Sequence, residues 1–178
     1  MKLTIEYSNI ALSKQKLDAI IVFIFENSGI TGSGLNSLPN AMKKNLNNSL
    51  KLKIFTGKKE NCHQLFSGYT NIPQILAVGA GKRSEINSEA LRRSAGKAGK
   101  IMTSLKAKKI GFVVTSDLQK NSKIDIGQVL VEGLILGSYQ FNLYKESYDA
   151  KSPFESIKIQ CCDPEKITSR KALKTGSI

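Results

Sequence analysis

The first 25 residues of this chain contain two stretches with the hydrophobic pattern of β-strands. Residues 2–7 alternate, with Leu3, Ile5 and Tyr7 on one side and polar residues on the other, as in a half-buried strand. Residues 19–25 are continuously apolar and rich in β-branched and aromatic side chains, which is typical of a strand covered on both faces. The two patterns together predict a layered α/β fold.

Helical spacing appears next. Residues 29–39 are rich in Gly, Ser and Asn, and residues 40–50 then carry Met42, Leu46 and Leu50 four positions apart. We expect a loop followed by a short helix. A longer helix is predicted over residues 88–105, because its apolar residues recur at spacings of four and three and form one stripe, namely Leu91, Ala95, Ala98, Met102 and Leu105.

Both long helices of the second half have N-terminal caps in the sequence. Asn87 or Ser88 can cap the helix at 88–105, and Glu89 stands favourably in its first turn. Asp125 can cap a helix over residues 126–139. Each of these residues can satisfy backbone N–H groups or the positive end of the helix dipole.

The remaining apolar runs predict further strands. We expect a hairpin at 54–66 around Gly57-Lys58-Lys59, and strands at 75–78, 110–114 and 154–161. Strands and helices therefore alternate along most of the chain. The predicted fold class is α/β, with a mixed, mostly parallel sheet sandwiched between helices.

Composition narrows the class of protein. The chain has 178 residues, enough for one domain with a sizeable core, and a net charge of +13 with a pI near 9.7. Such a charge suits polyanions, but it also fits a lysine-rich composition typical of the whole organism. The longest apolar run is too short to span a membrane and the first residues have no signal-peptide pattern, so we expect a cytoplasmic protein.

Groups for catalysis or metal binding are scarce. Cys62 and the single histidine, His63, are neighbours, and neighbours on a strand point to opposite faces, so they cannot form a dyad. Cys161 and Cys162 complete three cysteines with no CxxC spacing, which indicates plain thiols. The acidic residues are scattered. We therefore expect no catalytic residue and no metal site in this chain.

Two features could bind phosphate. Gly79-Ala80-Gly81-Lys82 follows a predicted strand, but it lacks the third glycine of GxGxxG and the spacing of a P-loop, so a sharp turn explains it more simply. A basic face is the candidate nucleic-acid-binding surface, and it comprises Lys82, Arg83, Arg93, Lys97 and Lys100. Without aromatic residues among these cations, an ordinary solvated face is the competing interpretation.

Two motifs in this sequence resemble the N-terminal domain of the leucyl aminopeptidase (cytosol aminopeptidase) family. The first is a strand ending in a glycine turn and followed by a helix, with Gly79, Gly81, Lys82, Leu91, Arg92, Ala95 and Gly96 at matching positions. The second, more specific motif has Glu132, Gly133, Leu136, Tyr139, Phe141, Tyr144 and Lys145. Ala80 stands where the family usually has leucine.

The resemblance implies a macro-domain-like α/β domain over residues 1–162, with residues 163–178 starting a linker helix to a catalytic domain. That second domain would hold two divalent metals, manganese or zinc among them, and release N-terminal amino acids from peptides. Its metal-binding motif is absent from this chain. The resemblance also implies a homohexamer for the full-length protein, and we expect the chain alone to be a monomer.

The resemblance also gives the second motif a structural role. We expect Gly133 and Gly137 to let their helix approach the sheet, and Tyr139, Phe141 and Tyr144 to close the lower core. Two functions remain open. The chain is either the non-catalytic N-terminal domain of an aminopeptidase, with the catalytic domain as its partner, or a stand-alone basic module that binds DNA or a nucleotide-like ligand.

Overall fold

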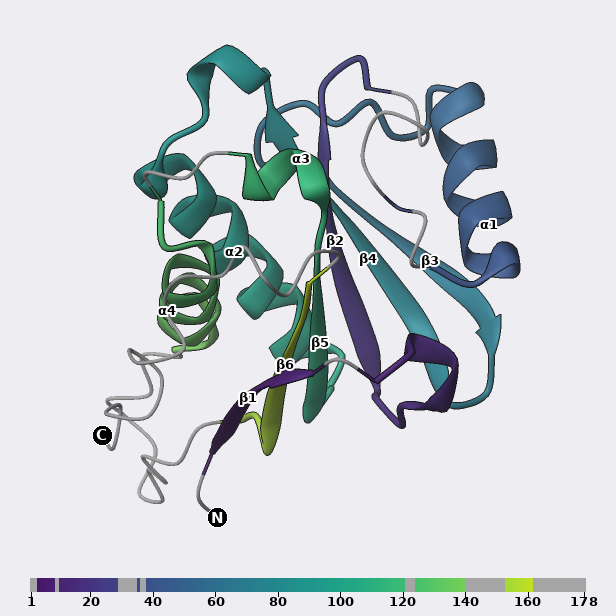
Figure 1. Ribbon diagram of the computed structural model, residues 1–178, viewed down its shortest axis with the longest axis vertical. Coiled ribbons are helices and arrows are strands. Elements are labelled where there is room, and N and C mark those ends of the chain that lie inside the picture. The colour runs from purple at the N-terminus through teal and green to yellow at the C-terminus, as the bar shows by residue number, and fades with distance from the viewer. Residues whose placement is uncertain are drawn as a thin grey trace.

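The computed structural model describes residues 3–8, 10–28, 35, 38–120, 124–139 and 153–161. They form a six-stranded sheet with helices on both faces (Figure 1). The strands are β1 (Thr4–Ser8), β2 (Ala19–Phe25), β3 (Cys62–Tyr69), β4 (Ile72–Gly81), β5 (Lys109–Val114) and β6 (Ser156–Cys161). The helices are α1 (Asn40–Lys51), α2 (Ser88–Ser104), the short α3 (Ser116–Gln119) and α4 (Ile126–Ser138).

The sheet is mixed and mostly parallel, as predicted. Its strand order is β1-β6-β5-β2-β4-β3, and every neighbouring pair is parallel except the antiparallel pair β3–β4. All seven residues of β2 are buried, because this strand lies inside the sheet and both its faces are covered. In β1 only alternate apolar side chains pack on the core, which confirms the half-buried strand.

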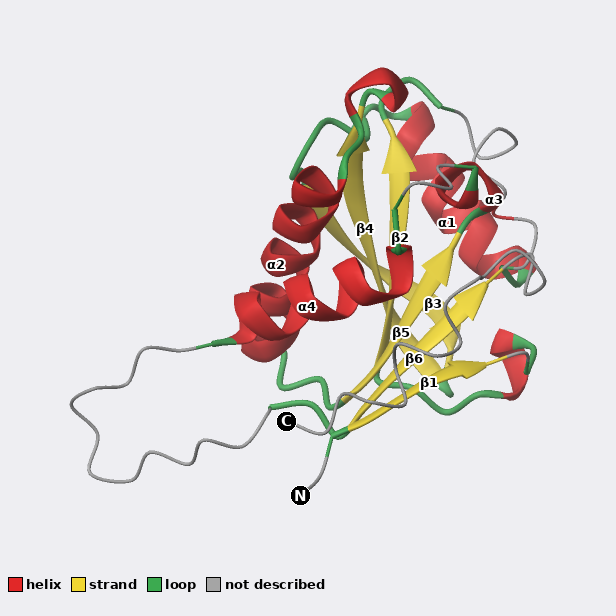
Figure 2. Ribbon diagram, turned by 60° about the vertical axis from the view of Figure 1, so that its left-hand side comes forward, coloured by secondary structure: helices red, strands yellow, loops and turns green. Residues whose placement is uncertain are grey.

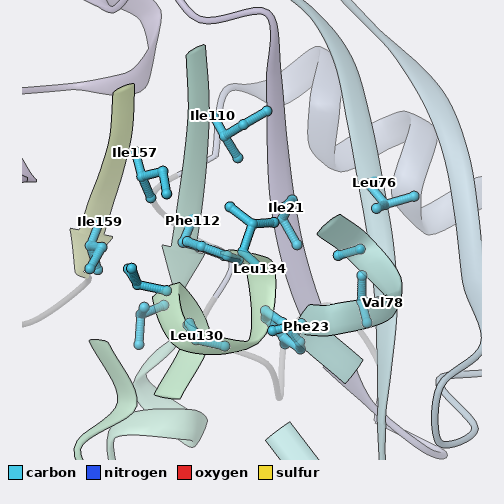
Figure 3. Close-up of a cluster of buried hydrophobic side chains, with 14 of the residues drawn as sticks. Ile21, Phe23, Leu76, Val78, Ile110, Phe112, Leu130, Leu134, Ile157 and Ile159 are labelled. Atoms are coloured by element: carbon cyan, nitrogen blue, oxygen red, sulfur yellow. The ribbon is translucent and has the colours of Figure 1, made fainter. Parts of the chain in front are cut away.

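Helices divide the apolar side chains into two cores. α2 and α4 stack against each other on one face, where Leu130 and Leu134 point toward Phe23 and Phe112 of the sheet (Figures 2 and 3). The rings of Phe23 and Phe112 are themselves stacked, with centroids 6.2 Å apart. α1 covers the other face through Met42 and Leu46. This two-sided packing confirms the sheet sandwiched between helices.

Both predicted caps on these helices are present. The side chain of Asn87 accepts a hydrogen bond from the backbone N–H of Ala90 at 2.8 Å, and that of Asp125 accepts one from Gln128 at 3.2 Å. Each cap satisfies one N–H group that has no partner inside its helix. The predicted starts of α2 and α4 are therefore correct.

The hairpin predicted at 54–66 is wrong. The antiparallel partner strands are β3 and β4, joined by Thr70 and Asn71. Residues 54–61 form a loop in which Gly57 has a φ of +73° and packs against the carbonyl group of Phe25. A glycine is therefore needed here because the backbone packs closely against the end of β2. A contact between segments so far apart in the chain leaves no pattern in the local sequence.

β4 is longer than the strand predicted at 75–78. Pro73 lies inside it, where the ladder with β3 shifts register between Phe66 and Tyr69. A proline has no N–H to donate, so this irregularity lets the strand begin before Pro73 without a missing ladder bond.

The glycines of α4 bring it close to α2, and the predicted approach to the sheet is wrong for them. A Cβ on Gly133 would overlap the carbonyl oxygen of Arg92, and one on Gly137 would overlap that of Gly96. On the α2 side, a Cβ on Gly99 would overlap the carbonyl oxygen of Leu134. The two helix backbones therefore touch along a seam lined by Gly96, Gly99, Gly133 and Gly137.

Tyr139 does not close the core, contrary to our prediction, because its residue is 63% exposed. It follows Leu134 by five positions, which places it roughly 140° around a helix from that core-facing side chain. Phe141, Tyr144 and the linker segment 163–178 lie outside the described residues. No helix in the described part of the chain is long and apolar enough to cross a membrane.

Candidate functional site

The two sequence motifs meet along the seam between α2 and α4. Arg92 from the first motif binds Glu132 from the second, with Nη2 and Oε2 3.2 Å apart, and also binds Glu89 at 2.9 Å. The hydrogen bonds that the Arg92 guanidinium donates to Glu89 and then to Glu132 raise its pKa above the ordinary value. The motif residues Arg92 and Glu132 therefore hold α2 and α4 together, which is a structural role.

At the end of β4, the backbone N–H groups of Gly79 and Gly81 are both hydrogen-bonded to a neighbouring loop. The N–H of Gly79 donates to Asn61 O at 2.7 Å, and that of Gly81 donates to Gly57 O at 3.0 Å. A phosphate-binding loop needs free backbone N–H groups that point at the ligand. Both glycine N–H groups already donate to carbonyl groups of the loop at 57–61. The sequence predicts a sharp turn at these glycines, but in the structure they form the last part of β4.

An ion pair closes the carboxyl end of the central strands. Nη2 of Arg83 lies 2.7 Å from Oδ2 of Asp117, and its guanidinium carbon lies 5.0 Å from the ring centroid of Phe25. The side chain of Asp117 is only 5% exposed. The hydrogen bond from Arg83 lowers the pKa of Asp117 below its ordinary value. Arg83 thus connects the end of β4 to α3 and β2.

We expect Asp117→Asn to lower the free energy of unfolding by about 1 kcal/mol at pH 7, because it removes one charge from a largely buried ion pair whose arginine is half exposed. The folded-state pKa of Asp117 is depressed, so its contribution is complete above the ordinary pKa of about 4 and is lost as the pH falls through the folded-state pKa. Urea unfolding at pH 7 and at about pH 3 measures both effects.

Glu85→Gln is the matched control. Glu85 forms an ion pair with Lys82 at 3.3 Å, but both side chains are well exposed, so the change should cost less than about 0.5 kcal/mol at either pH. An equal effect of the two substitutions at pH 7, or a cost of Asp117→Asn that grows in acid, would contradict this account of Asp117.

Three of the five predicted nucleic-acid-binding residues are paired with carboxylates. Lys82 binds Glu85, Arg83 binds Asp117, and Nη2 of Arg93 lies 3.1 Å from Oε1 of Glu60. Within the described part of the chain, Lys97 and Lys100 have no carboxylate within ion-pair distance, and both are exposed. The structure therefore leaves these two lysines as the most available cations of the set.

The loop before β3 adds two cations that the sequence-based prediction did not include. Lys58 and Lys59 are exposed, and the side chain of Lys59 lies next to Gly81. They therefore stand near Lys82. The packing of Gly57 against β2 determines where this loop lies. The sequence therefore shows that positions 58 and 59 are lysines, but it does not show that they lie near Lys82.

Cys62 and His63 do not form a dyad, as predicted from strand geometry. Cys62 packs on the α2 side of the sheet, while Nε2 of His63 lies 3.4 Å from Oγ of Ser49 in α1, on the other side. Burial raises the pKa of the Cys62 thiol, and nearby Lys97 partly opposes this. A thiol with a raised pKa is a weak nucleophile at neutral pH.

Metal ligands do not converge in the described residues. No group of three or more His, Cys, Asp or Glu side chains is close enough there to hold a metal ion. The two divalent metals implied by the sequence resemblance therefore do not fit this part of the chain.

Phe66 is a residue that the sequence-based prediction missed. It is 79% exposed, although it lies in a strand of the sheet. Alternation along β3 could have indicated only the side on which its ring lies, because Leu65 is the inward-facing apolar residue and Phe66 must then share the opposite side with Gln64.

Comparison with known proteins assigns the family. The family described as cytosol aminopeptidase family, N-terminal domain, matches residues 21–147, more than half of the chain. Probable cytosol aminopeptidases are similar as well: that of Clostridium perfringens is 33% identical over 129 residues and that of Trichormus variabilis 30% over 161. These matches cover 72% and 88% of this chain, but only 25% and 32% of the relatives.

Solved structures share the fold. A mutant of tomato leucine aminopeptidase superposes with a TM-score of 0.67 at 22% identity, over 93% of this chain and 35% of that protein. A Trypanosoma brucei macrodomain in complex with ADP-ribose has a TM-score of 0.58 at 11% identity, over 92% of this chain and 65% of that one. The predicted macro-domain-like fold is confirmed, and this chain belongs to the cytosol aminopeptidase family, whose N-terminal domain it contains.

Proposed function

We propose that this chain is the non-catalytic N-terminal domain of a leucyl aminopeptidase, and that it works by packing on a catalytic domain of the same protein. The observation that carries the proposal is the match of residues 21–147 to the N-terminal domain of the family. The chain spans only about a quarter to a third of the length of the curated relatives. On this proposal, the metal-dependent removal of N-terminal amino acids belongs to the remainder of such a protein.

The arrangement of side chains supports a structural role. The motif residues Arg92 and Glu132 bind each other, and the motif glycines let α2 and α4 touch. A peptidase that uses two metals needs several carboxylates at one point. The described residues offer no such group. We further propose that the protein is cytoplasmic and that residues 1–178 alone are monomeric, which light scattering tests directly.

An activity assay tests the absence of catalysis. Purified chain 1–178 with leucine p-nitroanilide and added Mn²⁺ or Zn²⁺ should release nitroaniline no faster than the buffer does, because the metal-binding motif of the family is absent from its sequence. A full-length leucine aminopeptidase serves as the positive control. Activity that follows the chain through successive purification steps would overturn the proposal.

The alternative of a nucleotide-like ligand has less support. The T. brucei macrodomain of similar fold was solved in complex with ADP-ribose, and α/β sheets bind ligands at the carboxyl ends of their strands. In this chain that edge is occupied by Arg83, Asp117 and Phe25, and the N–H groups of Gly79 and Gly81 bind the neighbouring loop. Titration with ADP-ribose should therefore produce no saturable change in tyrosine fluorescence.

A further inference from the structure

The end of α4 exposes two apolar side chains on one side of the helix. Leu136 is 65% exposed and Tyr139 is 63% exposed. They are three positions apart, a spacing that makes two side chains neighbours on the surface of a helix. The backbone N–H of Tyr139 donates to Leu136 O at 3.3 Å, which keeps the two residues in this arrangement. We call Leu136 and Tyr139 the α4 patch.

The α4 patch points away from the core of the domain. Leu130 and Leu134 point from α4 toward the sheet (Figure 3). Leu136 follows Leu134 by two positions, which turns it about 200° around the helix axis. A third side of the same turn is occupied by α2, because Gly137 packs against the backbone of Gly96. The sheet and α2 therefore occupy other sides of α4 and leave the α4 patch to solvent.

The polar groups on the outer side of α4 are paired with one another and with α2. Nε2 of Gln128 donates to Oε1 of Glu132 at 2.7 Å, and Oε2 of Glu132 lies 3.2 Å from Nη2 of Arg92. Leu136 stands one turn after Glu132, and residues 133–139 carry no charged side chain. A helix end that is apolar on every side is typical of a buried helix. An exposed apolar area beside paired polar groups is typical of a surface that contacts another protein.

The α4 patch lies in the part of the chain that its longer relatives share. Leu136 and Tyr139 fall inside residues 21–147, which match the N-terminal domain of the family. The curated relatives are about three to four times as long as the part that matches this chain. In the tomato leucine aminopeptidase mutant, the same fold occupies 35% of a longer chain. In such proteins this domain has further polypeptide beside it.

We propose that the α4 patch is the surface on which the catalytic domain of the same protein docks, through an apolar area of its own. This inference rests on the proposed function and adds the surface that the packing uses. A second copy of the chain is a poorer occupant, because two copies that each carry a net charge of +13 repel each other. The hydroxyl group of Tyr139 can form a hydrogen bond at the edge of such a contact.

Photo-crosslinking in the protein encoded by the complete reading frame identifies the occupant. The photoreactive amino acid p-benzoylphenylalanine, placed at position 139 instead of Tyr139, should become joined under ultraviolet light to peptides that lie beyond residue 178. Mass spectrometry identifies these peptides. The same amino acid in place of Phe66, an exposed ring on β3, is the matched control and should give much less of this product.

Thiol labelling measures how far the patch is covered. Leu136→Cys should react with N-ethylmaleimide at least about 10-fold more slowly in the full-length protein than in chain 1–178, because a covered surface is open for about a tenth of the time or less. Leu52→Cys is the matched control, since Leu52 is similarly exposed at the end of α1, and it should react equally fast in both proteins. Both positions are exposed, so neither substitution should change the urea midpoint of chain 1–178.

The failure of this inference can be distinguished from that of the proposed function. Equal labelling of Leu136→Cys in the two proteins would overturn the inference alone, provided that the full-length protein hydrolyses leucine p-nitroanilide. A reading frame that encodes no catalytic domain would overturn both.

Two other occupants would also overturn the inference. Crosslinks from position 139 to a second copy of α4 would indicate a dimer. Labelling of Leu136→Cys in chain 1–178 that slows when vesicles of phosphatidylglycerol are added would indicate a lipid surface. Crosslinks to peptides beyond residue 178, together with slower labelling in the full-length protein, would support docking of the catalytic domain.

Discussion

Replacement of Phe112 by alanine should lower the free energy of unfolding by about 3–5 kcal/mol, the largest effect that we expect from a single substitution in this domain. Phe112 is fully buried in β5 and its ring is stacked on that of Phe23. The substitution removes apolar contacts and leaves a cavity beneath α4, which backbone packing prevents from closing. Urea unfolding followed by far-UV circular dichroism measures the loss, since the chain has no tryptophan.

Phe66→Ala is the matched control for Phe112→Ala. The same atoms are removed from a ring that is 79% exposed, so the free energy of unfolding should change by less than about 0.5 kcal/mol. A cost for Phe66→Ala close to that for Phe112→Ala would show that the side chain of Phe66 is covered in solution.

Gly99→Ala should lower the free energy of unfolding by about 1–3 kcal/mol. A Cβ at this position would overlap the backbone carbonyl oxygen of Leu134 on α4, and a backbone atom cannot turn aside as a flexible side chain can. The two helices would have to separate, which would disturb the packing of α4 on the sheet. This expected loss is a net value, because the clash must first outweigh the roughly 1 kcal/mol by which alanine stabilises a helix relative to glycine.

Gly96→Ala separates that clash from helix propensity. Gly96 lies one turn before Gly99 in α2, but a Cβ there would lie 3.4 Å from the carbonyl oxygen of Gly133, close to ordinary contact. We expect the free energy of unfolding of this variant to exceed that of the wild type by up to about 1 kcal/mol. If Gly99→Ala were as stable as Gly96→Ala, the seam would not be as close as the structure has it.

Most helices and strands could be predicted from the sequence because their signals are local. The buried run of β2, the stripe of α2 and the caps at Asn87 and Asp125 each depend on residues within a few positions of one another. The hairpin is the main failure. Gly57 looked like a turn residue, but its positive φ serves a contact with Phe25 of β2, a strand far earlier in the chain.

The candidate site shows the same division. The sequence identified five cations, but pairing depends on carboxylates from other segments: Glu60 reaches Arg93 from a loop, and Asp117 reaches Arg83 from α3. The exposure of Phe66 depends in the same way on the position of β3 at the edge of the sheet. Strand alternation alone indicates only the side of the sheet on which its ring lies.

By itself, the sequence determined the fold class, the main helices and strands, and the family resemblance, because hydrophobic periodicity and helix capping act over a few residues. Only the tertiary structure decided that the motif glycines join α2 to α4, that Arg92 binds Glu132, and that Lys97 remains available while Arg93 is paired. Each of these facts depends on which distant segments come within a few ångströms, and strand order, which sets those distances, is a property of the whole packed chain.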